Sequence, residues 1–127
     1  MGPEIIPATS EHIAHIAAHI RLADKAELAE IWRQSPVVAL VDSLNQSTHA
    51  WTGLVDDEPI CMFGVASGGI LGDVGRPWMI GTTKLDKYAV IFLRRCKGCV
   101  ELMQSEYSTL INMVAADNEL AIRLLVS

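Results

Sequence analysis

Cys96 and Cys99 form a CxxC pair, the spacing found in redox dithiols and in half of many zinc sites. A redox dithiol needs a helix N-terminus beside its first thiol, because that position lowers the thiol pKa. Both cysteines instead fall on the apolar stripe of a predicted long helix, three turns after its start, and no second cysteine pair completes a zinc site. We therefore interpret the pair as small buried residues.

Three histidines, His12, His15 and His19, share one side of a predicted helix because they are three and four residues apart. Imidazoles at this spacing could contact one metal ion. Their side of the helix, however, lies roughly 100° from the apolar face that begins at Ile13, where solvated residues normally lie. No carboxylate or second histidine pair completes a ligand set, so we expect no metal site.

Glycines between residues 67 and 75 resemble a loop that cradles a phosphate: Gly68, Gly69, Gly72 and Gly75. Such a loop works by directing backbone N–H groups and a helix N-terminus at the anion. This segment leads into a predicted strand at Trp78 instead. We interpret it as a connection between strands.

A second glycine-containing segment is a better candidate for an anion site. It consists of Ile80, Gly81, Thr82, Thr83 and Lys84. The segment joins a predicted strand to the N-terminus of the long helix, whose dipole favours a phosphate. The same residues also fit an ordinary helix start, because Thr83 and Asp86 have capping-box spacing. The sequence leaves both interpretations open.

Hydrophobic periodicity predicts the elements that position these residues. They are a strand at 4–8, helices at 13–20, 24–34 and 36–44, a hairpin of strands 49–55 and 59–66, a strand at 78–80, a helix at 83–107, a strand at 110–114 and a helix from 117. Short loops between the middle strands favour antiparallel pairing, and the long helix favours a parallel crossover. We therefore predict an α/β (α+β) three-layer domain whose mixed sheet has helices on both faces.

The helix after Ser35 has its own predicted details. Ser35 can cap this helix, because Pro36 follows at the first helical position. The residues predicted to face the core are Val37, Leu40, Val41 and Leu44.

Composition limits the class of protein. Half of the 127 residues are hydrophobic and 20% are charged, which predicts one domain with a core over residues 1–127. Acidic residues outnumber basic ones by 15 to 10, which argues against nucleic-acid binding. No apolar run approaches the ~18 residues of a membrane span, and no secretory signal precedes the first strand. Three cysteines without an export signal argue against disulfides. We expect an intracellular protein.

The order of elements resembles the GNAT (GCN5-related N-acyltransferase) superfamily over nearly the whole chain. The segment Ile6-Pro7-Ala8-Thr9 is similar to the family's opening, and 54–65, with Gly64 late in its second strand, resembles the central hairpin. The family's N-x-x-A-x-x-L-Y pattern matches at Asn118, Ala121 and Leu124. The resemblance implies a three-layer GNAT-like fold, acetyl-CoA as cofactor and transfer of an acyl group to an amine.

A narrower resemblance involves GNAT-like proteins of short-tailed phages, of the internal virion protein A type. It rests on Trp78-Met79-Ile80-Gly81-Thr82, on Phe92-Leu93-Arg94-Arg95, and on Tyr107 and Asn118. It implies a phage or prophage gene, phage virion proteins as partners, and a location in the bacterial host cytoplasm or in the virion.

Three departures from the family pattern affect the catalytic half. The family turn R/Q-x-x-G-x-G/A, whose amides hold the cofactor pyrophosphate, corresponds to 81–86 here and has no second glycine or alanine. The family's frequent general acid, a tyrosine, is replaced by Leu125, which cannot protonate a leaving thiolate. The sequence stops at Ser127, before the family's closing strand pair. We therefore expect a C-terminally shortened, degenerate acyltransferase fold that serves as a virion-associated or accessory protein.

The alternative is an active acetyl-CoA-dependent N-acetyltransferase on an unknown amine. In that case the resemblance places the cofactor at Met79–Lys84 and at Asn118, which would lie near the thioester as a catalytic candidate. Glu58, Asp73 and His49 are candidates for the base. A third expectation is a homo-oligomer formed through the C-terminal helix. Its contact residues would be Ile122, Leu124, Leu125 and Val126.

Overall fold

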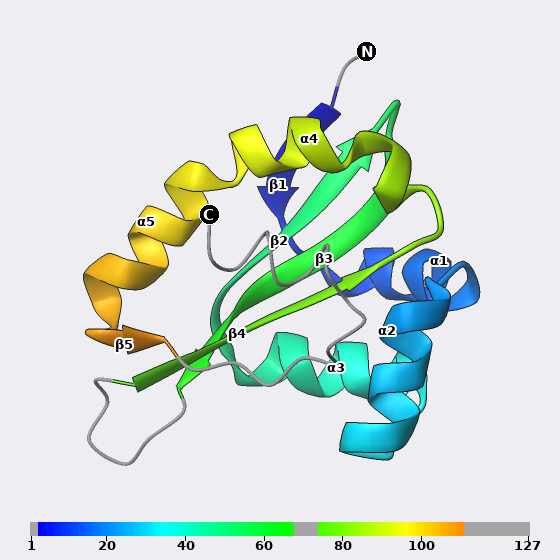
Figure 1. Ribbon diagram of the computed structural model, residues 1–127, viewed down its shortest axis with the longest axis horizontal. Coiled ribbons are helices and arrows are strands. Elements are labelled where there is room, and N and C mark those ends of the chain that lie inside the picture. Colours follow the sequence, from blue (N-terminus) through cyan, green and yellow to red (C-terminus); the bar gives the residue numbers. More distant parts are fainter. Residues whose placement is uncertain (1–2, 68–73, 111–127) are drawn as a thin grey trace.

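The computed structural model describes residues 3–67 and 74–110. The elements are, in chain order, β1 (Pro3–Pro7), the 3-10 turn η1 (Ser10–His12), α1 (Ile13–Ala18), α2 (Leu22–Glu27), the π-helical η2 (Leu28–Trp32), α3 (Pro36–Gln46), β2 (Ser47–Val55), β3 (Glu58–Ser67), β4 (Val74–Gly81), α4 (Leu85–Arg95), α5 (Lys97–Glu106) and β5 (Thr109–Leu110). Figure 1 shows α4 and α5 on one side of the strands and α1 and α3 on the other.

The strands form one mixed sheet in the order β1-β2-β3-β4-β5. The first three pairings are antiparallel, and β5 is parallel to β4 at Val74 and Gly75. The helices α4 and α5 make the crossover that parallel pairing requires. The predicted α/β class, mixed sheet and parallel crossover are therefore confirmed.

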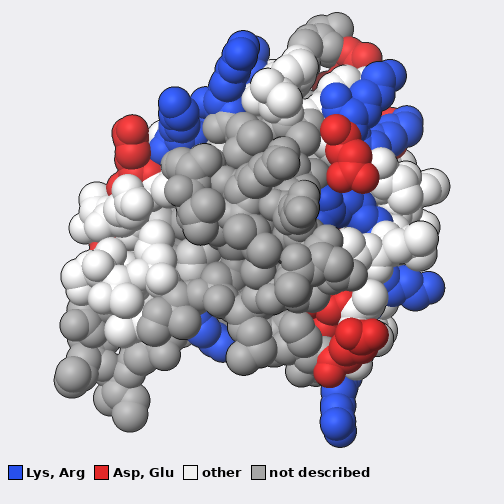
Figure 2. Space-filling view, viewed as in Figure 1, with Lys and Arg blue, Asp and Glu red and all other residues white. Residues whose placement is uncertain are grey.

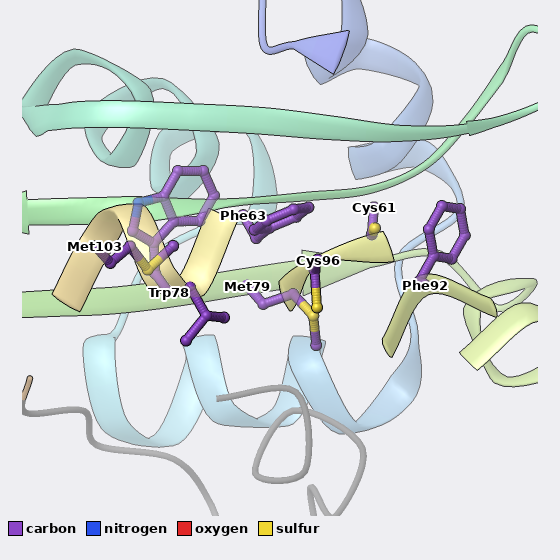
Figure 3. Close-up of a pocket in the computed structure, with 8 residues that line it drawn as sticks. Cys61, Phe63, Trp78, Met79, Phe92, Cys96 and Met103 are labelled. Carbon is purple, nitrogen blue, oxygen red and sulfur yellow. The ribbon is translucent and has the colours of Figure 1, made fainter. Parts of the chain in front are cut away.

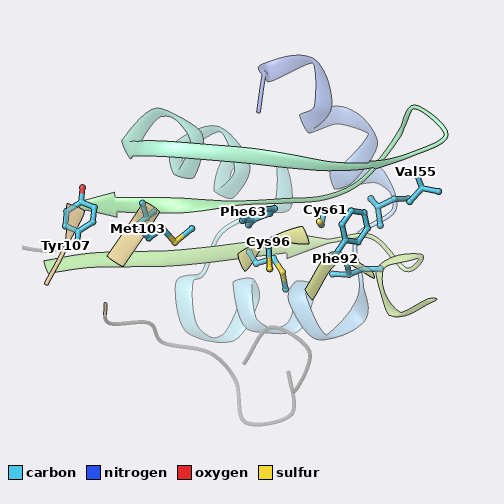
Figure 4. Close-up of a cluster of buried hydrophobic side chains, with 11 residues drawn as sticks. Val55, Cys61, Phe63, Phe92, Cys96, Met103 and Tyr107 are labelled. Carbon is cyan, nitrogen blue, oxygen red and sulfur yellow. The ribbon is translucent and has the colours of Figure 1, made fainter. Parts of the chain in front are cut away.

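Alternate residues of the central strands supply two cores, because successive side chains of a strand point to opposite faces. Met62 and Ile80 pack with α1 and α3 on one face. Cys61, Phe63 and Met79 pack with α4 and α5 on the other. Figure 4 shows Cys61 and Phe63 of the sheet facing Phe92 and Cys96. Both faces of the sheet are covered, as predicted.

Glycine permits the closest approach between two strands. Gly64 of β3 lies opposite Ala50 of β2. A Cβ at Gly64 would collide with the His49 carbonyl oxygen and lie 2.9 Å from the Ala50 Cα. Two backbones this close leave no room for a side chain.

The predicted helix after Ser35 is confirmed at its start and differs in its buried face. The Ser35 cap is confirmed, since Ser35 Oγ accepts the Val38 N–H at 3.3 Å. The predicted apolar face of α3 is wrong in part: Leu40 is buried, but Val37 and Val41 are exposed. Only a narrow strip of this short helix touches the sheet, so the flanking valines face outward.

The predicted helix 83–107 begins at Leu85 and is two helices that meet at Cys96. Cys96 has φ −87° and ψ 0°, which interrupts the regular helical backbone. The predicted cap at its start is also wrong. Lys84 is the N-cap residue and makes no side-chain capping bond, and the Asp86 carboxylate accepts from Arg21 instead.

Several predictions concern residues outside the described part of the chain. They are the loop glycines from 68 to 72, Asp73, most of the strand at 110–114, Asn118, the shortened C-terminus and the last helix with its contact residues. Among the described helices, none is long and apolar enough to cross a membrane.

Candidate functional site

The turn between β4 and α4 is the segment predicted to hold a phosphate. Backbone N–H groups bind an anion when no other acceptor engages them. Here five consecutive N–H groups have acceptors within the protein, at donor–acceptor distances of 2.7–3.4 Å. Gly81 donates to Asp24 Oδ2, Thr82 to the Ile60 carbonyl, Thr83 to the His19 carbonyl, Lys84 to Thr82 Oγ1, and Leu85 to the Thr82 carbonyl.

A buried ion pair fixes one of these acceptors. Arg21 Nε and Nη2 donate to the two oxygens of Asp24 at 3.1 and 3.0 Å, and both side chains are at most 7% exposed. Asp24 Oδ2 also accepts the Gly81 N–H at 2.7 Å. Burial alone would lower the pKa of Arg21, but its hydrogen bond to Asp24 and the charges of Asp24 and Asp86 outweigh burial and raise it. The guanidinium therefore stays charged, and the carboxylate remains on the Gly81 amide.

The connection between α1 and α2 runs along the far edge of β4 at this point. Ile20 forms an antiparallel bridge with Thr82. The Arg21 N–H donates to the Gly81 carbonyl at 2.8 Å, and the Thr83 N–H donates to the His19 carbonyl at 3.0 Å. The segment 19–21 thus covers the end of β4 on the side away from β3.

The lysine of the turn is also engaged. Lys84 Nζ donates to Glu58 Oε1 at 2.8 Å, and the other oxygen of Glu58 lies 3.0 Å from His15 Nε2. The hydrogen bond from Lys84, followed by that from His15, lowers the pKa of Glu58. Glu58 is therefore a poor general base, because a carboxylate with a lowered pKa binds a proton weakly.

The charges around the turn oppose a further anion. Two cations, Arg21 and Lys84, lie among three carboxylates, Asp24, Glu58 and Asp86. Asp86 is in the first turn of α4, where its negative charge already complements the helix dipole. The two cations Arg21 and Lys84 are therefore already paired with carboxylates.

The remaining predicted site residues do not converge on this turn. Ile80 points into the core shared with α1 and α3. His49 lies opposite Val65 in the β2–β3 ladder and pairs with Glu106 at 2.7 Å. Val65 follows Glu58 by seven positions along β3, which is about 23 Å at the usual strand rise.

The CxxC cysteines are packing residues. Burial raises the pKa of Cys99 to about 11 and raises that of Cys96, which is the opposite of what a redox dithiol needs. Figure 3 shows Cys61 and Cys96 at a cavity between the sheet and the helices. The cavity holds about 20 Å³, little more than one water molecule. Its lining is apolar side chains and thiols: Cys61, Phe63, Trp78, Met79, Phe92, Cys96, Val100 and Met103.

Two of the three histidines of the first helical segment connect it to the sheet. His12 Nδ1 lies 2.8 Å from Thr52 Oγ1, His15 pairs with Glu58, and the His15 and His19 rings lie 4.6 Å apart. Their predicted solvated environment is wrong for His12 and His15, which are half-buried. Within the described residues, no group of three or more His, Cys, Asp or Glu side chains could hold a metal ion.

The architecture defines the class: this chain has the GNAT acetyltransferase fold. It superposes on an N-acetyltransferase from Staphylococcus aureus Mu50 with a TM-score of 0.67 and 13% identity, covering 98% of this chain and 80% of that one. A GNAT-family acetyltransferase from Bacillus anthracis gives a TM-score of 0.64 and 7% identity, covering 98% and 77%. At such identities the likeness shows the fold alone. No protein-family model matches the sequence. No curated protein is significantly similar to it.

The described residues of the turn do not fit the pyrophosphate of acetyl-CoA. A pyrophosphate needs unengaged N–H donors and a positive surrounding. The five donors at 81–85 have acceptors, and the cations Arg21 and Lys84 are paired with carboxylates.

Sequence reasoning missed the two residues that decide this, Arg21 and Asp24. Their i,i+3 spacing at the start of α2 is the one signal that could have indicated a local ion pair. Nothing in the sequence indicates that this pair meets Gly81, which is 57 positions away.

Proposed function

We propose that this GNAT-fold protein is not an acetyltransferase but a phage- or prophage-encoded accessory protein, associated with the virion, that acts through its surface. One observation carries the non-catalytic part: the five N–H groups at 81–85 have protein acceptors. Freeing them would require breaking the Ile20–Thr82 bridge and separating Asp24 from Gly81. The free energy lost with these contacts would reduce the affinity of the turn for a cofactor.

The phage-related part of the proposal is supported by the resemblance at 78–82 and 92–95. Of these residues, Ile80 and Phe92 are buried, and Arg94 and Arg95 are exposed. Antibody labelling of purified phage particles tests the phage-related part. The protein should remain with the phage particles after washing. Its presence only in lysates of infected cells would contradict a virion association.

Titration with acetyl-CoA tests the non-catalytic part. We expect no heat in calorimetry and no change in melting temperature at millimolar acetyl-CoA. A ligand at a hundredfold excess over its Kd would stabilise the fold by about 2.7 kcal/mol. Bound acetyl-CoA would therefore raise the melting temperature by a measurable amount. An acetyl-CoA-binding GNAT enzyme is the positive control.

Saturable binding of acetyl-CoA that is lost in Lys84→Gln would overturn the non-catalytic part of the proposal. It would favour the alternative of an active N-acetyltransferase with the cofactor at Met79–Lys84. Lys25→Gln, an exposed lysine of α2 without an ion-pair partner among the described residues, is the matched control.

A further inference from the structure

We propose that the outer face of α4 docks an acidic segment of a partner protein that carries apolar side chains between its carboxylates. This surface, the α4 face, consists of Lys87, Val90, Ile91 and Arg94, and Arg95 and Lys97 lie beside it. The inference rests on the proposed function, because an accessory protein that acts through its surface needs a surface that binds.

The four residues of the α4 face are three and four positions apart, which places them on one side of a helix. The stripe from Lys87 to Arg94 is about 10 Å long. Leu85, Phe92 and Cys96 lie on the opposite side and pack into the core. The α4 face therefore points away from the sheet.

The α4 face and its neighbours concentrate positive charge in an acidic protein. Lys87, Arg94, Arg95 and Lys97 are four of the ten basic residues of a chain whose net charge is −5. All four are exposed, and among the described residues none has a carboxylate partner. Figure 2 shows Lys and Arg side chains along the upper edge, where Figure 1 draws α4. Complementary charge on a partner would be attracted there.

Two exposed apolar side chains lie between these cations on the surface of α4. Val90 is 61% exposed and Ile91 is 39% exposed, although the opposite side of the same helix is buried. An apolar centre within a polar or charged rim is the arrangement found in protein–protein interfaces. The partner segment therefore needs apolar side chains as well as carboxylates.

The composition of the α4 face favours a protein over two other anionic partners. Single-stranded nucleic acids bind surfaces that offer exposed aromatic rings for base stacking. Tyr88 of α4 is half-buried against the core, and the exposed large hydrophobic residues of the described chain include no aromatic one. Helices that lie in a membrane surface insert a wide apolar face, whereas the α4 face offers only Val90 and Ile91.

Fluorescence anisotropy with a labelled probe peptide tests the proposal. The probe is a short helical peptide with leucines at i, i+3 and i+4 between glutamates, compared with a scrambled peptide of identical composition. We expect saturable binding that weakens with salt and is at least tenfold weaker for the scrambled peptide. Amide chemical shifts in the full-length protein should change along α4.

Matched variants assign the binding to the α4 face. Lys87→Glu/Arg94→Glu should abolish it, and Val90→Ser/Ile91→Ser should weaken it at least fivefold at unchanged charge. Lys25→Glu/Arg76→Glu changes the net charge equally at exposed cations elsewhere and should retain binding. Equal loss in both charge-reversed variants would overturn the proposal.

Two competing probes complete the experiment. Binding of single-stranded RNA, or of phosphatidylserine vesicles, in preference to the peptide would overturn the assignment to a protein partner. None of these measurements involves acetyl-CoA. Cofactor binding would therefore contradict the proposed function while leaving the peptide result interpretable by itself.

Discussion

The Asp24 carboxylate occupies the position at which an anion would meet the first N–H of the β4–α4 turn. It does so as part of a buried pair with Arg21, and its Oδ2 accepts the Gly81 N–H at 2.7 Å. The sequence indicated a turn at 81–86 that lacks the second glycine or alanine of the family pattern. The structure gives a different reason against an anion there, which is that the hydrogen-bond donors of the turn are engaged.

Replacing Asp24 tests how much its contacts with Arg21 and Gly81 contribute to the free energy of unfolding. Asp24→Ala leaves the Arg21 guanidinium buried and without its main partner, which should lower the free energy of unfolding by about 3–5 kcal/mol. Asp86→Asn is the control, because it removes the other carboxylate on Arg21 from a side chain that is 74% exposed. That change should lower the free energy of unfolding by less than about 1 kcal/mol. Urea unfolding measures both, and similar losses would contradict the role of Asp24.

Glu58 gives the fold a defined acid sensitivity. Its pKa is lowered by Lys84 and then by His15, so its contribution to stability is present above the unfolded-state pKa of about 4.3. That contribution is lost as the pH falls through the lower, folded-state pKa. Unfolding measured at a series of acidic pH values should show a fall in stability that Glu58→Gln reduces. An unchanged slope in Glu58→Gln would contradict this assignment.

At the scale of elements, the hairpin of β2 and β3 depends on a glycine that no side chain can replace. A Cβ at Gly64 would meet backbone atoms of His49 and Ala50, which cannot rotate away. Gly64→Ala should therefore lower the free energy of unfolding by about 1–3 kcal/mol.

Gly98 in α5 is the matched control for the Gly64 substitution. A Cβ there meets nothing within 4 Å. Gly98→Ala should raise the free energy of unfolding by about 0.5–1 kcal/mol, because alanine favours a helix over glycine. Thermal unfolding of the two variants should shift in opposite directions, and a loss in Gly98→Ala would show that α5 is constrained there.

At the scale of the whole molecule, the GNAT architecture is present while the described turn residues do not fit acetyl-CoA. Two cores on opposite faces of the sheet hold the layers together, and both consist of the protein's own side chains. A likeness of fold does not by itself assign a reaction.

Self-association through the predicted C-terminal helix is tested on the whole chain. We expect sedimentation velocity to show a concentration-dependent dimer, because Ile122, Leu124, Leu125 and Val126 of the sequence are apolar and would be covered in such a contact. Replacing Leu125 with Glu should favour the monomer. A monomer at every concentration would contradict the prediction.

Much of the fold followed from local patterns. The strands β2 and β3 and the Ser35-Pro36 helix start are encoded within short segments. Local patterns failed where the outcome depends on contacts between distant segments. The exposure of Val37 and Val41 depends on how much of α3 the sheet can cover.

The sequence by itself determined the order of elements, the mixed sheet and the location of the candidate turn at 80–84. Only the tertiary structure decided what that turn can bind, because its N–H acceptors come from His19, Asp24 and Ile60 as well as from Thr82. A hydrogen bond depends on where two groups meet in space, and no local pattern encodes a meeting between residues 57 positions apart.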